Sequence, residues 1–208
     1  MSGAPKPLLM PAELENGGTF LAFWNRPELI KESLNLAKIY CVMHFANKTL
    51  RQVAALPFLP MLQGFDVLLI TSRKGNRWLL PKGWTRARQA QADTAAQEAF
   101  EESGVVGEVH GVPVGEFVYR KSMRQGYRVD CHVFVYPLLV TEHHNEWPER
   151  EWRERRWVDL AKAGELVGDP GLANLLVDLA ENDSAGLRTL VKDMGPGVSS
   201  VHQVARGM

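Results

Sequence analysis

PKGWTRARQAQADTAAQEAFEESGVVG, residues 81–107, opens with a proline and a glycine and carries three glutamates just before a second glycine. In a helix, offsets of three and four residues place Glu98, Glu101 and Glu102 on one face. Like charges on one face repel each other, and no Lys or Arg lies within a helical turn of them. The sequence therefore predicts a cation brought from elsewhere, and a divalent metal ion is the simplest candidate.

Basic residues are concentrated in two stretches that contain no acid. Residues 67–92 hold Arg73, Lys74, Arg77, Lys82, Arg86 and Arg88. Residues 120–128 hold Arg120, Lys121, Arg124 and Arg128. The formal net charge of the chain is zero, so no general field draws it to nucleic acid or to a membrane. Basic stretches beside an acidic triplet instead predict a site for a polyanion together with a metal ion.

The chain from residue 50 onward reads as short strands followed by helices. Apolar runs at 51–58, 65–72 and 77–81 are separated by turn residues, and residues 127–142 alternate at first as a half-buried strand does. A strand and helix are expected within 154–167, with Asp159 as the helix N-cap, and a last helix at 171–182. This order predicts an α/β domain over 48–182, a mixed sheet with helices on both faces.

The ends of the chain have a different character. Residues 1–47 form an extension with one amphipathic helix that starts near Pro27, and 183–208 are expected to be a tail. That helix packs either on the main domain or on a second subunit, which would make the protein a homodimer. The two cysteines, Cys41 and Cys131, lack a metal-ligand spacing. Together with the absence of a bilayer-length apolar run, this indicates a reduced, cytoplasmic protein without a membrane partner.

Read at fixed spacing, the quoted stretch resembles the Nudix box, Gly-x5-Glu-x7-Arg-Glu-U-x-Glu-Glu-x-Gly-U, in which U is a bulky aliphatic residue. The matching positions are Gly83, Glu98, Glu101, Glu102, Gly104 and Val105. The flanking segments DVLLITSRKGNRWLLPKGW and RRWVDLAKAGELV extend the resemblance over about residues 50–167. The chain looks most like the diphosphoinositol polyphosphate and diadenosine polyphosphate phosphohydrolases of that family. The resemblance implies a Nudix-like α/β/α sandwich.

The resemblance also implies a hydrolase that cleaves a diphosphate linkage by attack of water on phosphorus. It assigns Glu98, Glu101 and Glu102 as catalytic residues and as ligands of Mg²⁺ or Mn²⁺, which accept oxygen ligands and activate water. The backbone carbonyl of Lys82 would complete the metal site. Gly83 would let its loop approach the helix closely, and Gly104 would end the helix.

Basic side chains would bind the phosphates of the substrate and position the leaving group. The candidates are Arg77, Lys82, Arg86, Arg88, Arg120, Lys121, Arg124 and Arg128. The expected substrate is a phosphorylated small molecule, either a diphosphoinositol polyphosphate or a dinucleoside polyphosphate. No specific nucleic acid is expected as a partner.

Two positions depart from the box, because Gln89 and Gln97 stand where the family has Glu and Arg. In the family that Arg pairs with a box glutamate and holds its orientation. Losing such a charge-assisted contact costs about 1.5–3 kcal/mol, unless an Arg from another strand replaces it. One alternative is therefore a Nudix-fold binding or regulatory module with little turnover. Another is an interaction protein that dimerises through its N-terminal helix.

Overall fold

The computed structural model describes residues 50–75, 77–122, 128–182 and 184–193. The expected N-terminal extension with its helix, Cys41, Arg124 and most of the tail lie outside the described residues. The strands are β1 (Leu50–Pro60), β2 (Phe65–Thr71), β3 (Trp78–Leu79), β4 (Lys82–Trp84), β5 (Val105–Val109), β6 (Gly115–Ser122), β7 (Arg128–His143) and β8 (Arg155–Asp159). The helices are α3 (Gln91–Ser103), the short 3₁₀ helix η1 (Arg150–Trp152), α4 (Leu160–Leu166), α5 (Pro170–Glu181) and α6 (Ser184–Asp193).

A parallel pair of strands, β1 and β7, forms the middle of the sheet. Their register runs from Leu50 opposite Cys131 to Phe58 opposite Leu139. All the other strand pairs of the described residues are antiparallel, with β2 and β4 on β1, β5 and β6 on β7, and β3 and β8 on β2. The sheet is therefore mixed, as predicted.

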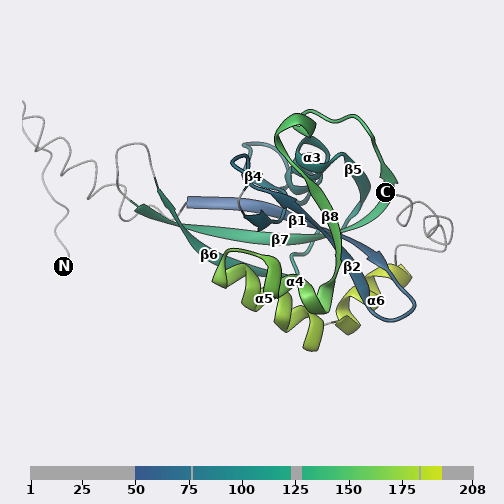
Figure 1. Ribbon diagram of the computed structural model, residues 1–208. Helices are drawn as coiled ribbons and strands as arrows, with labels where there is room; N and C mark the ends of the chain where they lie inside the picture. The colour runs from purple at the N-terminus through teal and green to yellow at the C-terminus, as the bar shows by residue number, and fades with distance from the viewer. Residues whose placement is uncertain (1–49, 76, 123–127, 183, 194–208) are drawn as a thin grey trace, which may run out of the picture. The chain divides into compact units, whose positions relative to one another are not determined.

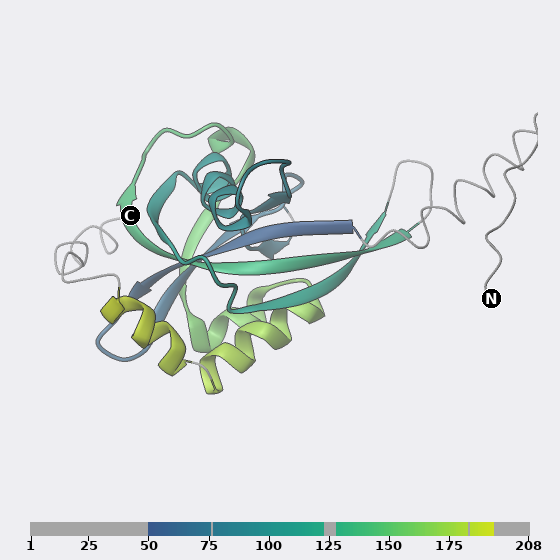
Figure 2. The ribbon, with the colours of Figure 1, turned by 180° about the vertical axis from the view of Figure 1, so that it is seen from behind.

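Helices cover both faces of this sheet (Figures 1 and 2). On one side, Val53 and Ala55 of β1 pack in a core that includes residues of α3. On the other side, Ala54, Leu56 and Phe58 pack in a core with residues of α4, α5 and α6. Because alternate residues of a strand point to opposite faces, an apolar run such as 53–59 fits a strand that is covered twice. The expected α/β/α sandwich is confirmed.

Small residues allow α3 to lie close to the sheet. Its buried positions include Ala92, Ala95 and Ala99, which place little volume between helix and strands. The helix ends at Gly104, whose φ of 69° is left-handed and whose N–H donates to the carbonyl of Phe100 at 2.8 Å. Glycine adopts this conformation without the steric cost that a Cβ brings. Gly104 therefore ends α3 just after the three glutamates on its polar face.

The fold continues beyond the last helix that the sequence indicated. Residues 184–193 form α6, and Leu187 is fully buried in the core beneath α4 and α5. Asp159 is the N-cap of α4, as the sequence predicted, because its Oδ1 accepts the N–H of Ala161 at 3.0 Å. No described helix has the length and apolar run that crossing a bilayer would need.

The pairing of β5 with β7 predicts a large loss of stability for one added methyl group. A Cβ at Gly107, beside the register shift of β5, would overlap the carbonyl oxygen of Leu139 and lie 2.9 Å from the Cα of Val140. Gly107→Ala should lower the free energy of unfolding in urea by about 1–3 kcal/mol, because backbone must move. Gly111→Ala meets nothing within 4 Å and should leave stability unchanged or slightly higher. Equal stability of both variants would contradict this account of the strand pairing.

Candidate functional site

The site begins where the short strand β4 meets the polar face of α3. A Cβ added at Gly83 would overlap the carboxylate of Glu98, so only glycine permits this approach. One residue earlier, the backbone N–H of Lys82 donates to Glu102 Oε2 at 3.0 Å. Strand alternation explains this arrangement, because Gly83 faces α3 while the Lys82 side chain points to the other face of the sheet. Two of the three box glutamates are therefore held directly against β4.

Glu102 is the most buried of the three glutamates, with 6% of its surface exposed. The guanidinium of Arg153, whose side chain is 7% exposed, donates to Glu102 Oε1. Burial raises the pKa of Glu102 to about 7, and the charge of Arg153 and the N–H of Lys82 only partly offset that effect. Arg153 follows η1, so it reaches the helix from about fifty residues downstream.

Glu98 and Glu101 share a different cation. Arg86, in the loop after β4, lies 3.3 Å from Glu98 Oε1 and 3.5 Å from Glu101 Oε1. Burial raises the pKa of Glu98, the neighbouring charge of Glu101 raises it further, and Arg86 opposes both effects. The repulsion on this helix face is therefore offset by arginines from outside the helix, where the sequence had favoured a metal ion.

The two glutamines that depart from the box contact each other. Gln89 Nε2 donates to Gln97 Oε1 at 3.3 Å, and Gln97 Nε2 donates to Glu101 Oε1 at 2.7 Å. An amide can donate and accept at once, so the pair forms a neutral bridge that ends on a site carboxylate. Gln97 orients Glu101 without contributing a charge.

A fourth carboxylate, Glu149, joins the cluster from the loop between β7 and β8. Its backbone N–H donates to the carbonyl of Glu101 at 3.1 Å, and its carboxylate accepts from Arg73 and, at 2.6 Å, from Nε of Arg153. Burial alone would raise the pKa of Glu149, but the hydrogen bonds from both arginines outweigh it and lower the pKa. Sequence reasoning missed Glu149 because its segment, PEREWRERR, alternates charges and singles out no residue.

The chemistry of this cluster fits a divalent cation, because its side chains offer several carboxylate oxygens. Within the described residues, no group of three His, Cys, Asp or Glu side chains is arranged to hold a metal ion. Mg²⁺ does not require such a cage, because it keeps several waters and is usually bound by one or two carboxylates plus substrate phosphates. Glu98, Glu101, Glu102 and Glu149 supply oxygen ligands of the kind that Mg²⁺ prefers.

The structure separates the basic residues that the sequence singled out. Arg86 contacts the carboxylates, whereas the side chains of Lys82 and Arg77 line a pocket on the other face of β4. Lys121 lies over the ring of Trp84, with its Nζ 4.2 Å from the ring centroid. Trp84 is 43% exposed, so this pair stands at the surface beside β4.

The remaining basic candidates have no described contact with the carboxylates. Arg120 forms an exposed cross-strand ion pair with Asp130 at 3.4 Å. Arg128 is exposed at the start of β7, opposite Ser122. Arg88 is exposed and adopts a positive φ of 68° in the loop before α3. Arg124 lies outside the described residues.

The Arg153–Glu102 ion pair predicts a large effect on stability. Arg153→Met keeps the apolar stem but leaves the Glu102 carboxyl without its cation in a buried position. Removing one partner of such a pair typically costs 3–5 kcal/mol, to be measured as the free energy of unfolding in urea. Arg150→Met is the matched control, because its ion pair with Glu146 is exposed and should contribute less than about 1 kcal/mol. Similar losses in both variants would show that burial of the pair is not decisive.

The amide bridge predicts coupling between Gln89 and Gln97. Gln89→Glu alone removes the amide donor from Gln97 and adds a carboxylate near Glu101, so it should destabilise by about 1 kcal/mol. Adding Gln97→Arg rebuilds the ion pair expected of the family and should recover most of that loss. A double-mutant cycle in urea should give a coupling of about 0.5–3 kcal/mol, whereas additive effects would contradict the bridge.

Comparison with known proteins places this cluster in a family. The family model of the NUDIX domain matches residues 49–179, which span every element from β1 into α5. Nudix hydrolase 21, chloroplastic, from Arabidopsis thaliana is 41% identical over 102 residues, which cover 49% of this chain and 50% of the relative. Diphosphoinositol polyphosphate phosphohydrolase 3-beta from Bos taurus is 32% identical over 85 residues, 40% of this chain and 48% of the relative.

Among solved structures, the chain is similar to a C. elegans Ap4A hydrolase at 16% sequence identity and a TM-score of 0.47, over 67% of this chain and 99% of that one. The chain spans about half the length of the curated relatives it matches. The family model, in contrast, covers more than half of the chain and includes the whole carboxylate cluster. This chain belongs to the Nudix family.

Proposed function

We propose that this protein is a Mg²⁺-dependent hydrolase that cleaves a diphosphate linkage by attack of water on phosphorus. The observation that carries the proposal is the cluster of Glu98, Glu101 and Glu102 on one face of α3, packed against the β4 backbone at 82–83. The curated relatives support it, since their names describe Nudix hydrolases and a phosphohydrolase.

The box carboxylates and Glu149 would hold the cation, with the Lys82 carbonyl as a further candidate ligand. A bound divalent cation would neutralise the diphosphate oxygens and lower the pKa of a coordinated water. Mn²⁺ would serve the same purpose, because it also prefers oxygen ligands. Arg86 is exposed and contacts Glu98 and Glu101, so a bound cation would compete with it for these two carboxylates.

Glu98 is the best-placed proton acceptor. Burial and the charge of Glu101 raise the pKa of Glu98, and a raised pKa makes the carboxylate a better proton acceptor for the attacking water. The carboxylate of Glu98 lies close against the backbone of Gly83, and Arg86 donates a hydrogen bond to it from the loop after β4. Arg86 also offers a positive charge to the phosphates of the substrate. Together these contacts would orient the proton acceptor before the reaction starts.

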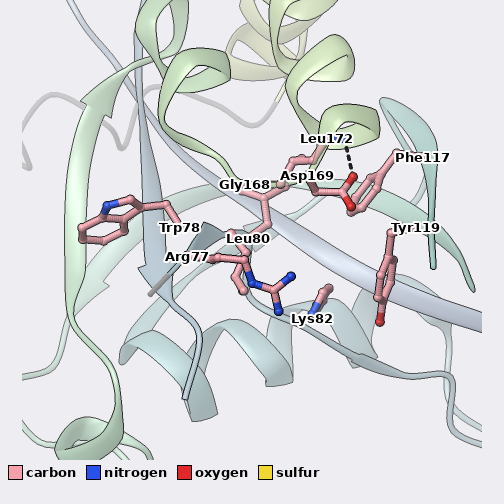
Figure 3. Close-up of a pocket in the computed structure, with 10 residues that line it drawn as sticks. Arg77, Trp78, Leu80, Lys82, Phe117, Tyr119, Gly168, Asp169 and Leu172 are labelled. Carbon is pink, nitrogen blue, oxygen red and sulfur yellow. Dashed lines mark hydrogen bonds between the residues drawn. The ribbon is translucent and has the colours of Figure 1, made fainter. Parts of the chain in front are cut away.

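The basic residues near the carboxylates favour a strongly anionic substrate, and two substrate classes fit. Lys82 lies in β4, and Arg77, Arg86 and Lys121 lie near this strand (Figure 3 shows Lys82 and Arg77). A strongly anionic substrate would be drawn to these four side chains. Diphosphoinositol polyphosphates and dinucleoside polyphosphates are the proposed classes, and the name of the bovine relative supports the first. The exposed Arg88, Arg120 and Arg128 would act only as a secondary attraction.

One observation favours a second function, a binding or regulatory module with little turnover. In the part of the chain that the structure describes, every box carboxylate already has a protein donor: Arg86 and Gln97 for Glu101, Arg86 for Glu98, and Arg153 for Glu102. A site neutralised in this way could bind a ligand without a metal ion. Metal-dependent turnover distinguishes the two functions.

The cellular location and the partners of the protein belong to the same proposal. We infer a cytoplasmic protein, because Cys131 is a free, buried thiol and the cysteine pattern is not that of a disulfide scaffold. The partner is the phosphorylated substrate, with no membrane and no specific nucleic acid. Dimerisation through residues 1–47 stays a prediction, as does the domain start at 48. The predicted domain end at 182 and tail from 183 do not fit α6, because Leu187 of that helix is buried in the core.

The test is release of phosphorylated products from a panel of diphosphate compounds in the presence of Mg²⁺. The panel holds diadenosine polyphosphates, diphosphoinositol polyphosphates, nucleotide sugars and nucleoside triphosphates. Turnover should stop in EDTA and return when Mg²⁺ or Mn²⁺ is added. Glu98→Gln should reduce kcat by about 10²–10⁴-fold, because it removes the proton acceptor while keeping the shape of the side chain.

Glu108→Gln is the matched control, since Glu108 is exposed on β5 and outside the cluster. Its kcat should equal that of the natural sequence. Glu101→Gln tests the metal ligands without disturbing the buried pair of Glu102, and it should raise the Mg²⁺ concentration needed for half-maximal rate. A folded protein with no turnover on any compound and with any metal would favour the binding module.

A further inference from the structure

The end of α3 is paired with the loop between β7 and β8. A helix leaves the carbonyl groups of its last turn without partners inside the helix, and here the loop supplies several of the donors. The N–H of Glu149 donates to the carbonyl of Glu101 at 3.1 Å, and the N–H of His144 donates to the carbonyl of Gly104 at 2.8 Å. The loop therefore meets the helix directly beside the site carboxylates.

Arg155, the first residue of β8, joins the helix and the loop with one side chain. Its Nη1 donates to the carbonyl of Ser103, the last residue of α3, at 2.8 Å, and to the carbonyl of His144 at 3.0 Å. Its guanidinium carbon lies 4.3 Å from the centroid of the Trp147 ring. That ring packs on the helix end, because a Cβ added at Gly104 would lie 3.0 Å from it. The contacts of Arg155 thus hold the helix end and the start of the loop together.

The guanidinium of Arg155 has no acidic partner in the described part of the chain, where none of the ion pairs includes it. Burial and the charge of Arg150 lower the pKa of Arg155, but an arginine still carries its charge at neutral pH. A positive charge at the C-terminal end of a helix interacts favourably with the helix dipole. Helix α3 has no basic residue in its own last turn, so Arg155 supplies that charge from β8.

The loop that Arg155 contacts carries two groups of the candidate active site. Glu149 brings a carboxylate, and Arg153 pairs with both Glu102 and Glu149. Both residues lie between His144, where Arg155 holds the loop, and Arg155 itself. A segment fixed at both ends has fewer conformations than a free one, so less entropy is lost when its carboxylate binds a cation.

We propose that Arg155 is a positioning residue of this site: by holding the β7–β8 loop on the end of α3, it keeps Glu149 in register with Glu101 and Glu102 and so raises the affinity for a divalent cation. The inference rests on the proposed function, because it concerns the metal ion that the hydrolase would use. Arg155 acts through the backbone of the helix and the loop, and the carboxylates make the contact with the cation.

The sign of the effect separates positioning from charge. A positive charge repels a cation, so removing the charge of Arg155 would by itself tighten the binding of a metal ion. Losing the contacts of Arg155 has the opposite effect, because the carboxylates then start from many arrangements. We expect the second effect to be the larger.

The test measures Mn²⁺ binding to the full chain by calorimetry without substrate, so that the result does not depend on turnover. Arg155→Met keeps the apolar stem and removes the donors, and it should weaken Mn²⁺ binding by about tenfold or more, because a preorganising contact is lost. Arg155→Lys keeps the charge and a donor, and it should recover part of that loss. Arg156→Met is the matched control, since Arg156 is the next residue of β8 and is exposed, and its affinity should not fall.

Amide hydrogen exchange reports on the loop itself, without a metal ion. In Arg155→Met, the N–H groups of His144 and Glu149 should exchange about ten times faster or more, because their partners on α3 are no longer held in place. The N–H of Leu56, in the buried middle of β1, should change much less. A residue that only stabilised the fold would lower the protection of all three alike.

The proposal is overturned if Arg155→Met binds Mn²⁺ as tightly as the natural protein or more tightly, because repulsion by charge would then be the larger effect. It is also overturned if the three amides lose protection by the same factor, or if the natural protein binds no Mn²⁺. Metal-dependent turnover decides the proposed function separately. Turnover together with equal Mn²⁺ affinity in both proteins would overturn the role of Arg155 and leave the proposed function standing.

Discussion

The buried ion pair between Arg153 and Glu102 is the interaction on which the site depends. Four carboxylates gather around the end of α3, and without opposite charges nearby this arrangement would repel itself. Arg153 reaches Glu102, Glu149 and the carbonyl of Thr71 at once, so one guanidinium joins α3, the β7–β8 loop and the end of β2. The fold therefore positions Glu102 and Glu149 by enclosing the cation that they share.

The sequence predicted the architecture well because the two patterns that indicate it, the apolar runs and the spacing of the box, both lie within short segments. Apolar runs between turn residues indicated the strands, and the box spacing indicated α3 and its end at Gly104. Asp159 was expected to cap the following helix, and it does. Helix α6 was not expected, since its main contribution to the core is the burial of Leu187, which periodicity over ten residues does not disclose.

The site was only partly predictable, because its cations come from distant segments. The sequence indicated that something must offset the charge of three glutamates, but it did not indicate that Arg86 and Arg153 do so. Glu149 was hidden among alternating charges, and its place beside Glu101 follows from the path of the β7–β8 loop. Of the basic residues, spacing could not distinguish Arg86, at the carboxylates, from Arg120, in an exposed pair on the hairpin.

The two glutamines gain a meaning that the box alone does not give. Each glutamine lacks the charge that the family has at its position. Together they were a reason to consider a binding or regulatory module with little turnover. In the structure they form one bridge to Glu101, and the charge that is missing at Gln97 is supplied to the cluster by Arg86 and Arg153. The arrangement keeps the carboxylates oriented and is consistent with the proposed enzyme.

The most direct test of the account is hydrolysis of a diadenosine polyphosphate with Mg²⁺ in oxygen-18 water, with the products analysed by mass spectrometry. The account predicts one oxygen-18 atom in a phosphate group of one product and none in the other, because water attacks phosphorus and a single P–O bond breaks. Intact substrate after prolonged incubation of folded protein, or products without the label, would contradict it.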